Sequence, residues 1–342
     1  MEIFVLYVWG FLAAWLITAV ALPLVRRIAG PWLTDKPGGL KKHTGVVPTV
    51  GGCGILMGVL GSLIIIRLST NFPSGTLHNL RGILLGSTLI FAMGLADDFT
   101  KPRGLPVWVK LFIQVLATAA LIHYDVVIQA VPNPWVAWPL TFLWVVGLTN
   151  AFNLLDIQNG LCVTQAIVCT AGLTLITLPH EYIYVNFAAL AVLGACLAFW
   201  PHNHAKKHPL FLGDSGSNLL GFLIAALSIG YGYSAHSNWG FLAPLFILAV
   251  PLFDTAFVSF ARLLKGKNPL LGSDDHAALR LQAAGWKKRH ILLTFTFAGL
   301  LCNFAAFWLT RGGIKTALIV FCITLASALT ATVYLLKKGP RI

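Results

Sequence analysis

Two adjacent carboxylates, Asp97 and Asp98, directly follow a long apolar stretch of the chain. On a helix, neighbouring side chains project about 100° apart, so the two carboxylates can serve different partners. Carboxylates at membrane depth are costly and usually functional. A solvated helix end is the ordinary alternative, and it accounts for one Asp more readily than for two. We predict that one carboxylate meets a metal ion and the other meets an incoming nucleophile.

Three polar side chains, Asn150, Asn153 and Asp156, close another apolar stretch at intervals of three residues. A helix that continued through them would present all three on one face. Amides both donate and accept hydrogen bonds, which suits recognition of a nucleobase or a sugar. Helix capping is the competing interpretation, and it explains one of these residues rather than the row.

A turn rich in Gly and Ser, residues 213–217, opens a third apolar stretch and contains Asp214. Backbone N–H groups at a helix N-terminus can hold phosphate, and Asp214 beside them would hold a divalent metal ion. Turns of this composition also cap many helices, so the motif is weak when taken alone.

The acidic residues are few and unevenly distributed. The chain has only 11 of them, and eight are expected on one membrane face: Asp35, Asp97, Asp98, Asp156, Asp214, Asp254, Asp274 and Asp275. Mg²⁺ takes oxygen ligands from one or two carboxylates and completes its shell with phosphate and water. Carboxylates clustered on a basic face therefore predict a Mg²⁺ site, with Mn²⁺ as a substitute, that receives a phosphorylated substrate.

Two further polar features stay open. His202, His204 and His208 form a loose group, for which a phosphate-attracting loop is favoured over zinc because no Cys or Glu completes a zinc site. Asp254 lies inside an apolar stretch after Pro251, where it either supports a site or satisfies a buried polar bond.

Long apolar stretches must position these side chains. The chain of 342 residues is 57% hydrophobic and 10% charged, whereas a soluble domain carries about 25% charged residues. This composition predicts an all-α polytopic membrane protein, because a spanning segment must satisfy its own backbone hydrogen bonds. We expect about eleven transmembrane helices, with ten as the alternative count, near 3–25, 50–68, 80–96, 105–123, 134–150, 160–178, 184–200, 215–234, 240–260, 290–310 and 314–336.

The basic residues give an orientation. Arg26 and Arg27 follow the first span and no Lys or Arg precedes it, so the N-terminus is expected outside and the span is an anchor rather than a cleaved signal. With eleven spans the C-terminus is cytoplasmic. All but four of the 24 Lys and Arg then lie on the cytoplasmic side, the exceptions being Arg67, Arg81, Arg311 and Lys315.

Residues 1–342 are expected to form a single integral-membrane domain, because no soluble domain, tandem repeat or low-complexity tract interrupts them. The basic face is suited to membrane lipid and anionic substrates. Nucleic-acid binding is excluded as the weaker explanation, since no basic soluble domain exists to carry it.

Taken together, these segments resemble the polyprenyl-phosphate N-acetylhexosamine-1-phosphate transferases, the family of the MraY and WecA enzymes, and look more like the WecA branch. The resemblance extends over nearly the whole chain. It rests on Pro48–Gly52, Asp97–Asp98, the run 150–160, Phe211–Ser217 and Pro251–Asp254, which occur in the family's order, each at the expected cytoplasmic face.

The resemblance implies that the protein is an Mg²⁺-dependent enzyme of a bacterial inner membrane with its active site at the cytoplasmic face. Its substrates would be a UDP-N-acetylhexosamine and polyprenyl phosphate, such as undecaprenyl phosphate, and UMP would be released. The product would start a lipid-linked glycan such as O-antigen, enterobacterial common antigen or teichoic acid. A homodimer would be compatible with this family.

By the same resemblance, Asp214 would be the main Mg²⁺ ligand and Asp98 would lie beside the metal. Asp97 would be a base or would position the lipid phosphate. The residues that hold the nucleotide would be Asn153, Asp156 and Asn203, with Asn150 in the same row and Phe211 stacked on the uracil.

One loop departs from the family. Where the family often has several histidines, this chain reads Asp275-His276-Ala277-Ala278-Leu279-Arg280, and only His276 remains. We expect His276 to be catalytic with Arg280 beside it on the diphosphate, because residues four apart share a helix face and Arg binds phosphate with two prongs. A catalytically silent homologue that acts as a partner is the main alternative, and a transporter is a weaker one.

Overall fold

The computed structural model describes residues 2–35, 45–70, 76–179, 183–205, 207–234, 237–268, 273 and 275–338. Asp274 and the basic residues Lys206 and Arg341 therefore lie outside the described part of the chain. The chain divides into two compact units, Met1–Gly232 and Tyr233–Ile342, which we describe separately. The single-domain expectation stays a prediction.

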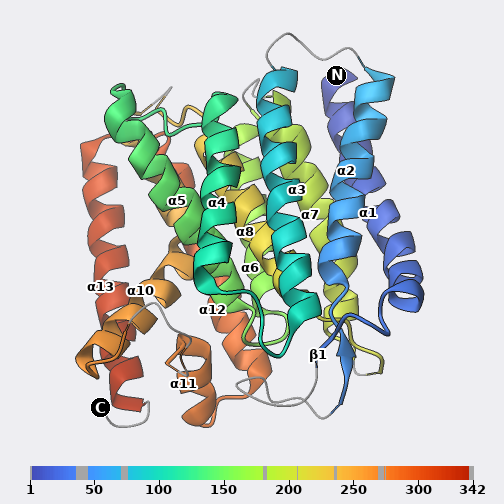
Figure 1. Ribbon diagram of the computed structural model, residues 1–342. Helices are drawn as coiled ribbons and strands as arrows, with labels where there is room; N and C mark the ends of the chain where they lie inside the picture. The colour runs from blue at the N-terminus through green and yellow to red at the C-terminus, as the bar shows by residue number, and fades with distance from the viewer. Residues whose placement is uncertain are drawn as a thin grey trace. The chain divides into compact units, whose positions relative to one another are not determined.

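The first unit is almost entirely helical (Figure 1). Its two short strands, β1 and β2, pair antiparallel, with Thr34 opposite Pro48. Its elements are α1 (Glu2–Ile28), β1 (Thr34–Asp35), β2 (Val47–Pro48), α2 (Gly51–Ser69), α3 (Thr76–Thr100), α4 (Val107–His123), α5 (Pro134–Leu155), α6 (Leu161–Thr177), α7 (Ile183–Asn203) and α8 (Gly213–Ile229).

Helix α8 is the central helix of this unit. Every residue from Ser215 to Ile229 is buried, and α3 and α5 pack along it (Figure 1). A helix that is apolar all round is stable only where other helices enclose it. The beginning of α8, which carries Asp214, is thereby fixed relative to the end of α3, which carries Asp97 and Asp98.

The second unit combines long and short helices and contains one sharp break. Predicted span 240–260 is not one helix: α9 and α10 meet at Leu248 with a bend of 66°. Pro251 explains the break, because a proline ring clashes with the carbonyl four residues earlier, here that of Ile247. The elements are η1 (Gly240–Leu242), α9 (Ala243–Ile247), α10 (Ala249–Leu264), α11 (Ala277–Ala283), α12 (Lys288–Leu309) and α13 (Ile314–Lys338).

The multi-pass helical class is confirmed. Among the described residues, seven helices are long and apolar enough to cross a membrane, and the bent pair α9–α10 would make eight. Helices α4 and α6 are apolar but have 17 residues each, about 25 Å at 1.5 Å per residue. Each of the eleven predicted spans lies on a helix or on the bent pair. The count of eleven and the orientation stay predictions.

Candidate active site

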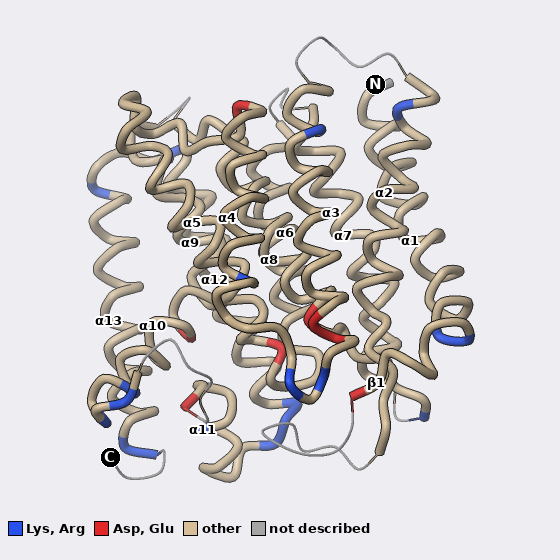
Figure 2. Tube along the Cα trace, in the orientation of Figure 1, with Lys and Arg blue, Asp and Glu red and all other residues tan. Residues whose placement is uncertain are grey.

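The last turn of α3 holds Asp97 and Asp98, and both side chains are buried although they are charged. Asp97 accepts a hydrogen bond from Lys110 Nζ on α4 at 2.6 Å and one from the main-chain nitrogen of Leu105 at 2.5 Å. Asp98 has different partners, as expected for neighbouring helical residues. Figure 2 shows acidic and basic positions gathered where α3 ends.

Asp98 closes the beginning of α8. Its two carboxylate oxygens accept hydrogen bonds from the main-chain nitrogens of Asp214 at 3.0 Å and Ser215 at 2.9 Å. The residue that precedes the helix, Leu212, has no side chain that can cap it. A carboxylate at a helix N-terminus satisfies unpaired N–H groups and complements the helix dipole. The N–H groups that we expected to hold phosphate therefore already hold Asp98.

Two lysines connect the three carboxylates. Lys101 Nζ lies 2.7 Å from Asp98 and 3.0 Å from Asp214. Lys110 Nζ lies 2.6 Å from Asp97 and 3.6 Å from Asp214. Burial alone would lower the pKa of Lys101, but the carboxylates of Asp214 and Asp98 raise it above its usual value. Lys101 is therefore charged. Counted formally, three carboxylates and two lysines give the carboxylate–lysine cluster a net charge of about −1.

Glycines bring the backbones of three helices into direct contact at this cluster. A Cβ atom on Gly52 of α2 would lie 2.4 Å from the main-chain nitrogen of Gly216, and one on Gly94 of α3 would lie 2.5 Å from the Cα of Ser215. Neither fits, because the atoms it would meet are main chain. Gly213 has a φ of +76°, which only glycine adopts readily. These close approaches explain how Asp98 reaches the first amides of α8.

Main-chain hydrogen bonds also join the two segments Pro48–Gly52 and Phe211–Ser217. The nitrogen of Phe211 donates to the carbonyl of Pro48 at 2.9 Å, and the nitrogen of Gly51 donates back to the carbonyl of Phe211 at 3.0 Å. A third bond runs from Gly52 to Leu212. The beginning of α2 is thus hydrogen-bonded to the segment that leads into α8.

The polar row at the end of α5 divides between two neighbouring helices. Asn150 exchanges hydrogen bonds with Gln114 of α4 at 2.8 and 3.3 Å. Asn153 accepts one from Ser217 of α8 at 2.8 Å. Helix α5 ends one residue before Asp156, which forms its C-cap, so the expected continuous helix through all three residues stops short. The row lies within the first unit, beside the helix that carries Asp214.

Asn203 and Phe211 are both buried. The amide of Asn203 donates to the carbonyl of Leu210 at 2.7 Å and so fixes the segment that leads into α8. The ring of Phe211 is only 3% exposed. Their expected contacts with a nucleotide stay predictions, and Phe211 would have to become accessible to stack on a base.

In the second unit, Asp254 of α10 holds the beginning of α11. Its carboxylate bonds Nδ1 of His276 at 2.7 Å and accepts from the main-chain nitrogen of Ala277 at 2.9 Å. A carboxylate on one imidazole nitrogen orients the ring and determines which nitrogen stays available. Asp254 therefore supports His276, which was one of the two roles that its position in the sequence left open.

Arg280 is bound within the same unit. Its guanidinium donates to Asp275 at 2.5 Å and to the carbonyl of Leu335 at 3.1 Å. Lys265 also pairs with Asp275, at 2.7 Å. Although a hydrogen bond connects the main chain of Arg280 to that of His276, the two side chains have different partners. The expected diphosphate contact of Arg280 stays a prediction.

The residues of the first unit suit a divalent ion at one carboxylate. Among the described residues, no group of three or more His, Cys, Asp or Glu side chains converges to hold a metal ion. Asp214 nevertheless turns both oxygens toward ammonium groups, which mark places where a cation can lie. Both oxygens of Asp98 are occupied by main-chain N–H groups. The geometry therefore favours Asp214 over Asp98 as a Mg²⁺ ligand, with phosphate and water completing the shell.

Several residues of this site were not predicted from the sequence. Lys101 and Lys110 bridge the carboxylates, Gln114 orients Asn150, and Ser217 bonds Asn153. Lys101 could have been found, because a lysine three residues after Asp98 faces it on a helix. Nothing in the sequence relates Lys110 to Asp97, since a turn separates them.

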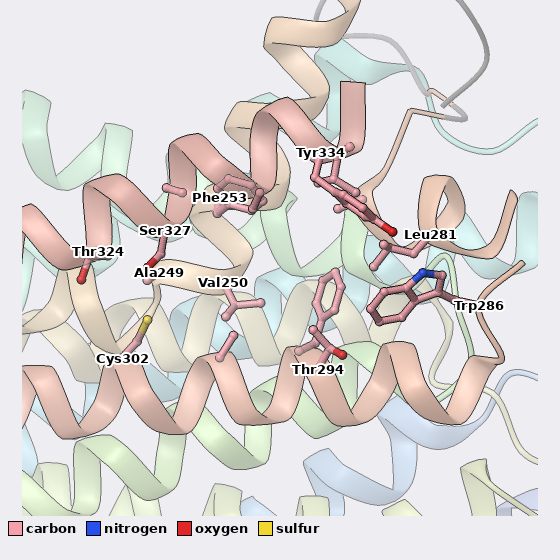
Figure 3. Close-up of a pocket in the computed structure, with 16 residues that line it drawn as sticks. Ala249, Val250, Phe253, Leu281, Trp286, Thr294, Cys302, Thr324, Ser327 and Tyr334 are labelled. Atoms are coloured by element: carbon pink, nitrogen blue, oxygen red, sulfur yellow. The ribbon is translucent and has the colours of Figure 1, made fainter. Parts of the chain in front are cut away.

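A different cavity lies in the second unit (Figure 3). It measures about 380 Å³ and lies among α10, α11, α12 and α13. Phe253, Leu281 and Phe295 are typical of its lining, which contains no acidic or basic side chain. Such a surface suits hydrocarbon rather than a nucleotide, so we do not place the chemistry there.

Comparison with known proteins relates the chain to a family of transferases. A family model described as glycosyl transferase family 4 matches residues 80–232. The chain is 28% identical over 326 residues to a probable undecaprenyl-phosphate N-acetylglucosaminyl 1-phosphate transferase of Bacillus subtilis (strain 168). The matched residues cover 92% of this chain and 88% of that protein.

Two further relatives have related names. A decaprenyl-phosphate N-acetylglucosaminephosphotransferase of Mycolicibacterium smegmatis is 26% identical over 333 residues, with 87% of this chain and 80% of that protein covered. A phospho-N-acetylmuramoyl-pentapeptide-transferase of Lactiplantibacillus plantarum is 30% identical over 328 residues, with 86% of this chain and 96% of that protein covered.

Proposed function

The chain belongs to glycosyl transferase family 4, and on this premise we propose that it transfers N-acetylhexosamine 1-phosphate from a UDP-sugar to polyprenyl phosphate. The names of its relatives support a lipid phosphate as acceptor. The product would be a polyprenyl diphosphate sugar that starts a lipid-linked glycan of the cell envelope.

The carboxylate–lysine cluster is the observation that carries this proposal. Asp97, Asp98 and Asp214 meet Lys101 and Lys110 within one unit, at the meeting point of three helices. Phosphoryl transfer needs charge neutralisation and alignment rather than a covalent protein nucleophile. A cluster of alternating charges, two of them on flexible lysine side chains, supplies both.

In the proposed reaction, an oxygen of the lipid phosphate forms a bond to the phosphorus that carries the sugar. The bond from that phosphorus to the bridging oxygen breaks, and UMP leaves with the electron pair. Lys101 and Lys110 would turn from the carboxylates to the phosphate oxygens as charge develops. Asp97 would position the lipid phosphate or accept its proton, since Lys110 already holds this carboxylate in place.

Asp214 would hold Mg²⁺, for which Mn²⁺ could substitute. The bound ion would neutralise charge on the diphosphate. Asp98 would then act through the main chain, by fixing the beginning of α8 and with it the carboxylate of Asp214.

The nucleotide would lie toward the polar row of α5, where Asn150, Asn153 and Asp156 offer donors and acceptors. Within the second unit, His276, whose ring Asp254 orients, is proposed as a further catalytic residue. We further propose that the cluster faces the cytoplasm and that the chain spans a bacterial inner membrane eleven times, because this orientation places most Lys and Arg inside.

A catalytically silent homologue is the second candidate, because the loop at His276 lacks the further histidines that the resemblance leads us to expect. One assay separates the two: purified protein with Mg²⁺, polyprenyl phosphate and a panel of UDP-N-acetylhexosamines, scored for UMP release. We expect turnover by the parent and a loss of about a hundredfold or more in Asp214→Asn. Asp125→Asn is the matched control, because Asp125 is exposed and pairs only with His78 among the described residues. A parent that releases no UMP with any donor would favour the silent homologue.

A further inference from the structure

A basic cavity lies in the first unit where α1 ends. It measures about 420 Å³ and is lined by Pro23, Arg26, Arg27, His202, His208 and Leu210. Four of these six residues have basic side chains and none is acidic. It shares no lining residue with the carboxylate–lysine cluster, so the proposed reaction does not account for it.

The histidines reach the cavity because the segment after α7 folds back on itself. The main-chain nitrogen of Leu210 donates to the carbonyl of His202 at 3.1 Å, and the amide of Asn203 donates to the carbonyl of Leu210 at 2.7 Å. These two bonds bring residues 202 and 208–210 together. His204 is directed elsewhere, since its ring packs on Trp200 at 4.3 Å between centroids.

His208 adopts an uncommon backbone conformation at the cavity. Its φ is 59°, in the left-handed region that residues other than glycine seldom occupy. Its carbonyl accepts a hydrogen bond from Nη1 of Arg26 at 3.2 Å. A guanidinium has five N–H donors, so this bond fixes the Arg26 head and leaves donors for another acceptor. Among the described residues, no carboxylate lies within ion-pair distance of Arg26 or Arg27.

We propose that Arg26, Arg27, His202 and His208 form a binding site for the phosphate group of an anionic phospholipid. Guanidinium groups bind phosphate oxygens in pairs, and imidazoles add single hydrogen bonds. Arg26 and Arg27 occupy the last turn of α1, a candidate membrane span, where lipid headgroups lie; the end of α1 is blue in Figure 2. Pro23, which is exposed and lines the cavity, provides apolar surface for the adjoining glycerol and acyl carbons.

Ordinary orientation charges would also place arginines at the end of a span. They would not require a carbonyl that holds Arg26 or a folded-back segment that brings two histidines to it. These two features distinguish a built site from a charged membrane edge.

Lipid titration of the purified full chain, read by native mass spectrometry, tests the proposal. The probes are phosphatidylglycerol, zwitterionic phosphatidylcholine and inorganic phosphate as a competitor. We expect phosphatidylglycerol to bind in preference to phosphatidylcholine, and Arg26→Gln/Arg27→Gln to weaken its binding about tenfold or more. The matched control is Arg67→Gln/Arg81→Gln, which removes the same charge from the ends of other helices and should bind like the parent.

A second variant separates loss of binding from loss of folding. His208→Gly removes one imidazole while suiting the left-handed backbone, and it should weaken binding by a few-fold. Competition by inorganic phosphate would support the phosphate chemistry and indicate that a free phosphate can occupy the site. Equal affinity in the parent and the double variant, or equal losses in the double variant and its control, would overturn the proposal.

Discussion

Asp98 accepts a hydrogen bond from the main-chain nitrogen of Asp214 at 3.0 Å, although 115 residues separate them along the chain. One carboxylate thus orients another through the backbone of α8. Asp254 does the same for α11, where it accepts from the nitrogen of Ala277 and holds His276. In each unit, a carboxylate on one helix closes the beginning of a second helix next to a candidate functional side chain.

Asp98→Ala is expected to lower the stability of the protein as well as its rate of UMP release. The substitution leaves the first amides of α8 unpaired and Lys101 without its closest carboxylate, so the free energy of unfolding should fall by about 1–3 kcal/mol. Asp97→Ala removes a carboxylate that caps no helix and should cost less stability. Thermal unfolding in detergent would compare the two. Equal losses of stability would contradict the capping role of Asp98.

Gly52→Ala is expected to disrupt the carboxylate–lysine cluster indirectly, by pushing α2 away from the beginning of α8. The new methyl group would meet the main-chain nitrogen of Gly216 at 2.4 Å, and such overpacking costs about 1–3 kcal/mol. Gly147→Ala is the control, because no atom lies within 4 Å of its Cβ position and it lies in α5. That variant should be neutral or slightly more stable. Unfolding temperature and UMP release are the measurements, and matching behaviour of the two variants would refute the packing argument.

The two cations that pair with Asp275 should make the stability of the protein depend on pH in the acid range. Burial would raise the pKa of Asp275, but Lys265 and Arg280 lower it from 3.8 to about 2. A carboxylate with a lowered pKa stabilises the fold fully above its unfolded value and loses that effect as pH falls toward about 2. Parent and Asp275→Asn should therefore differ in unfolding temperature above about pH 4 and converge as the pH approaches 2. A constant difference across this range would show that Asp275 acts without its charge.

Substitutions of His276 and Arg280 should have different main effects, on kcat/KM for His276 and on stability for Arg280. Arg280 is 1% exposed and pairs with Asp275, so Arg280→Ala should lower stability by about 3–5 kcal/mol, the cost of leaving one partner of a buried pair. His276→Ala should fold and lose about tenfold or more in kcat/KM for the UDP-sugar. If Arg280→Lys keeps stability but raises KM, Arg280 contacts the diphosphate as well. An unchanged kcat/KM in His276→Ala would remove the loop from the site.

The bent pair α9–α10 makes the topology testable. An eleven-span chain ends inside, whereas a pair that enters and leaves on one side would leave ten spans and a C-terminus outside. Lys337 and Lys338 at the end of α13 favour the inside. We expect a fluorescent reporter fused at the C-terminus to be active and an exported phosphatase reporter to be silent. The opposite pattern would refute the eleven-span count and favour ten.

Helix positions follow from local sequence, and they could be predicted here because an apolar run of spanning length has few alternatives in lipid. The break at Leu248 does not follow from the sequence pattern, because the stretch 240–260 is predominantly apolar and has spanning length in spite of Pro251 and Asp254. The carboxylates could be predicted as functional from their cost at membrane depth. Their partners could not, because Asp98 reaches α8 through glycine contacts that depend on three helices packing together, and no local pattern encodes that distance.

The glycine contacts at the beginning of α8 have a mechanical consequence. Gly52 and Gly94 meet main-chain atoms, which have no rotamers, so the spacing of α2, α3 and α8 varies little with side-chain motion. Asp98 is locked to this frame by two main-chain amides. The lysines are different: Lys101 and Lys110 keep about a quarter of their side-chain surface exposed and have four rotatable bonds each. The carboxylates are thus held on a stiff backbone, whereas the two ammonium groups can move. An anionic ligand can draw the lysine side chains toward itself without displacing the helices.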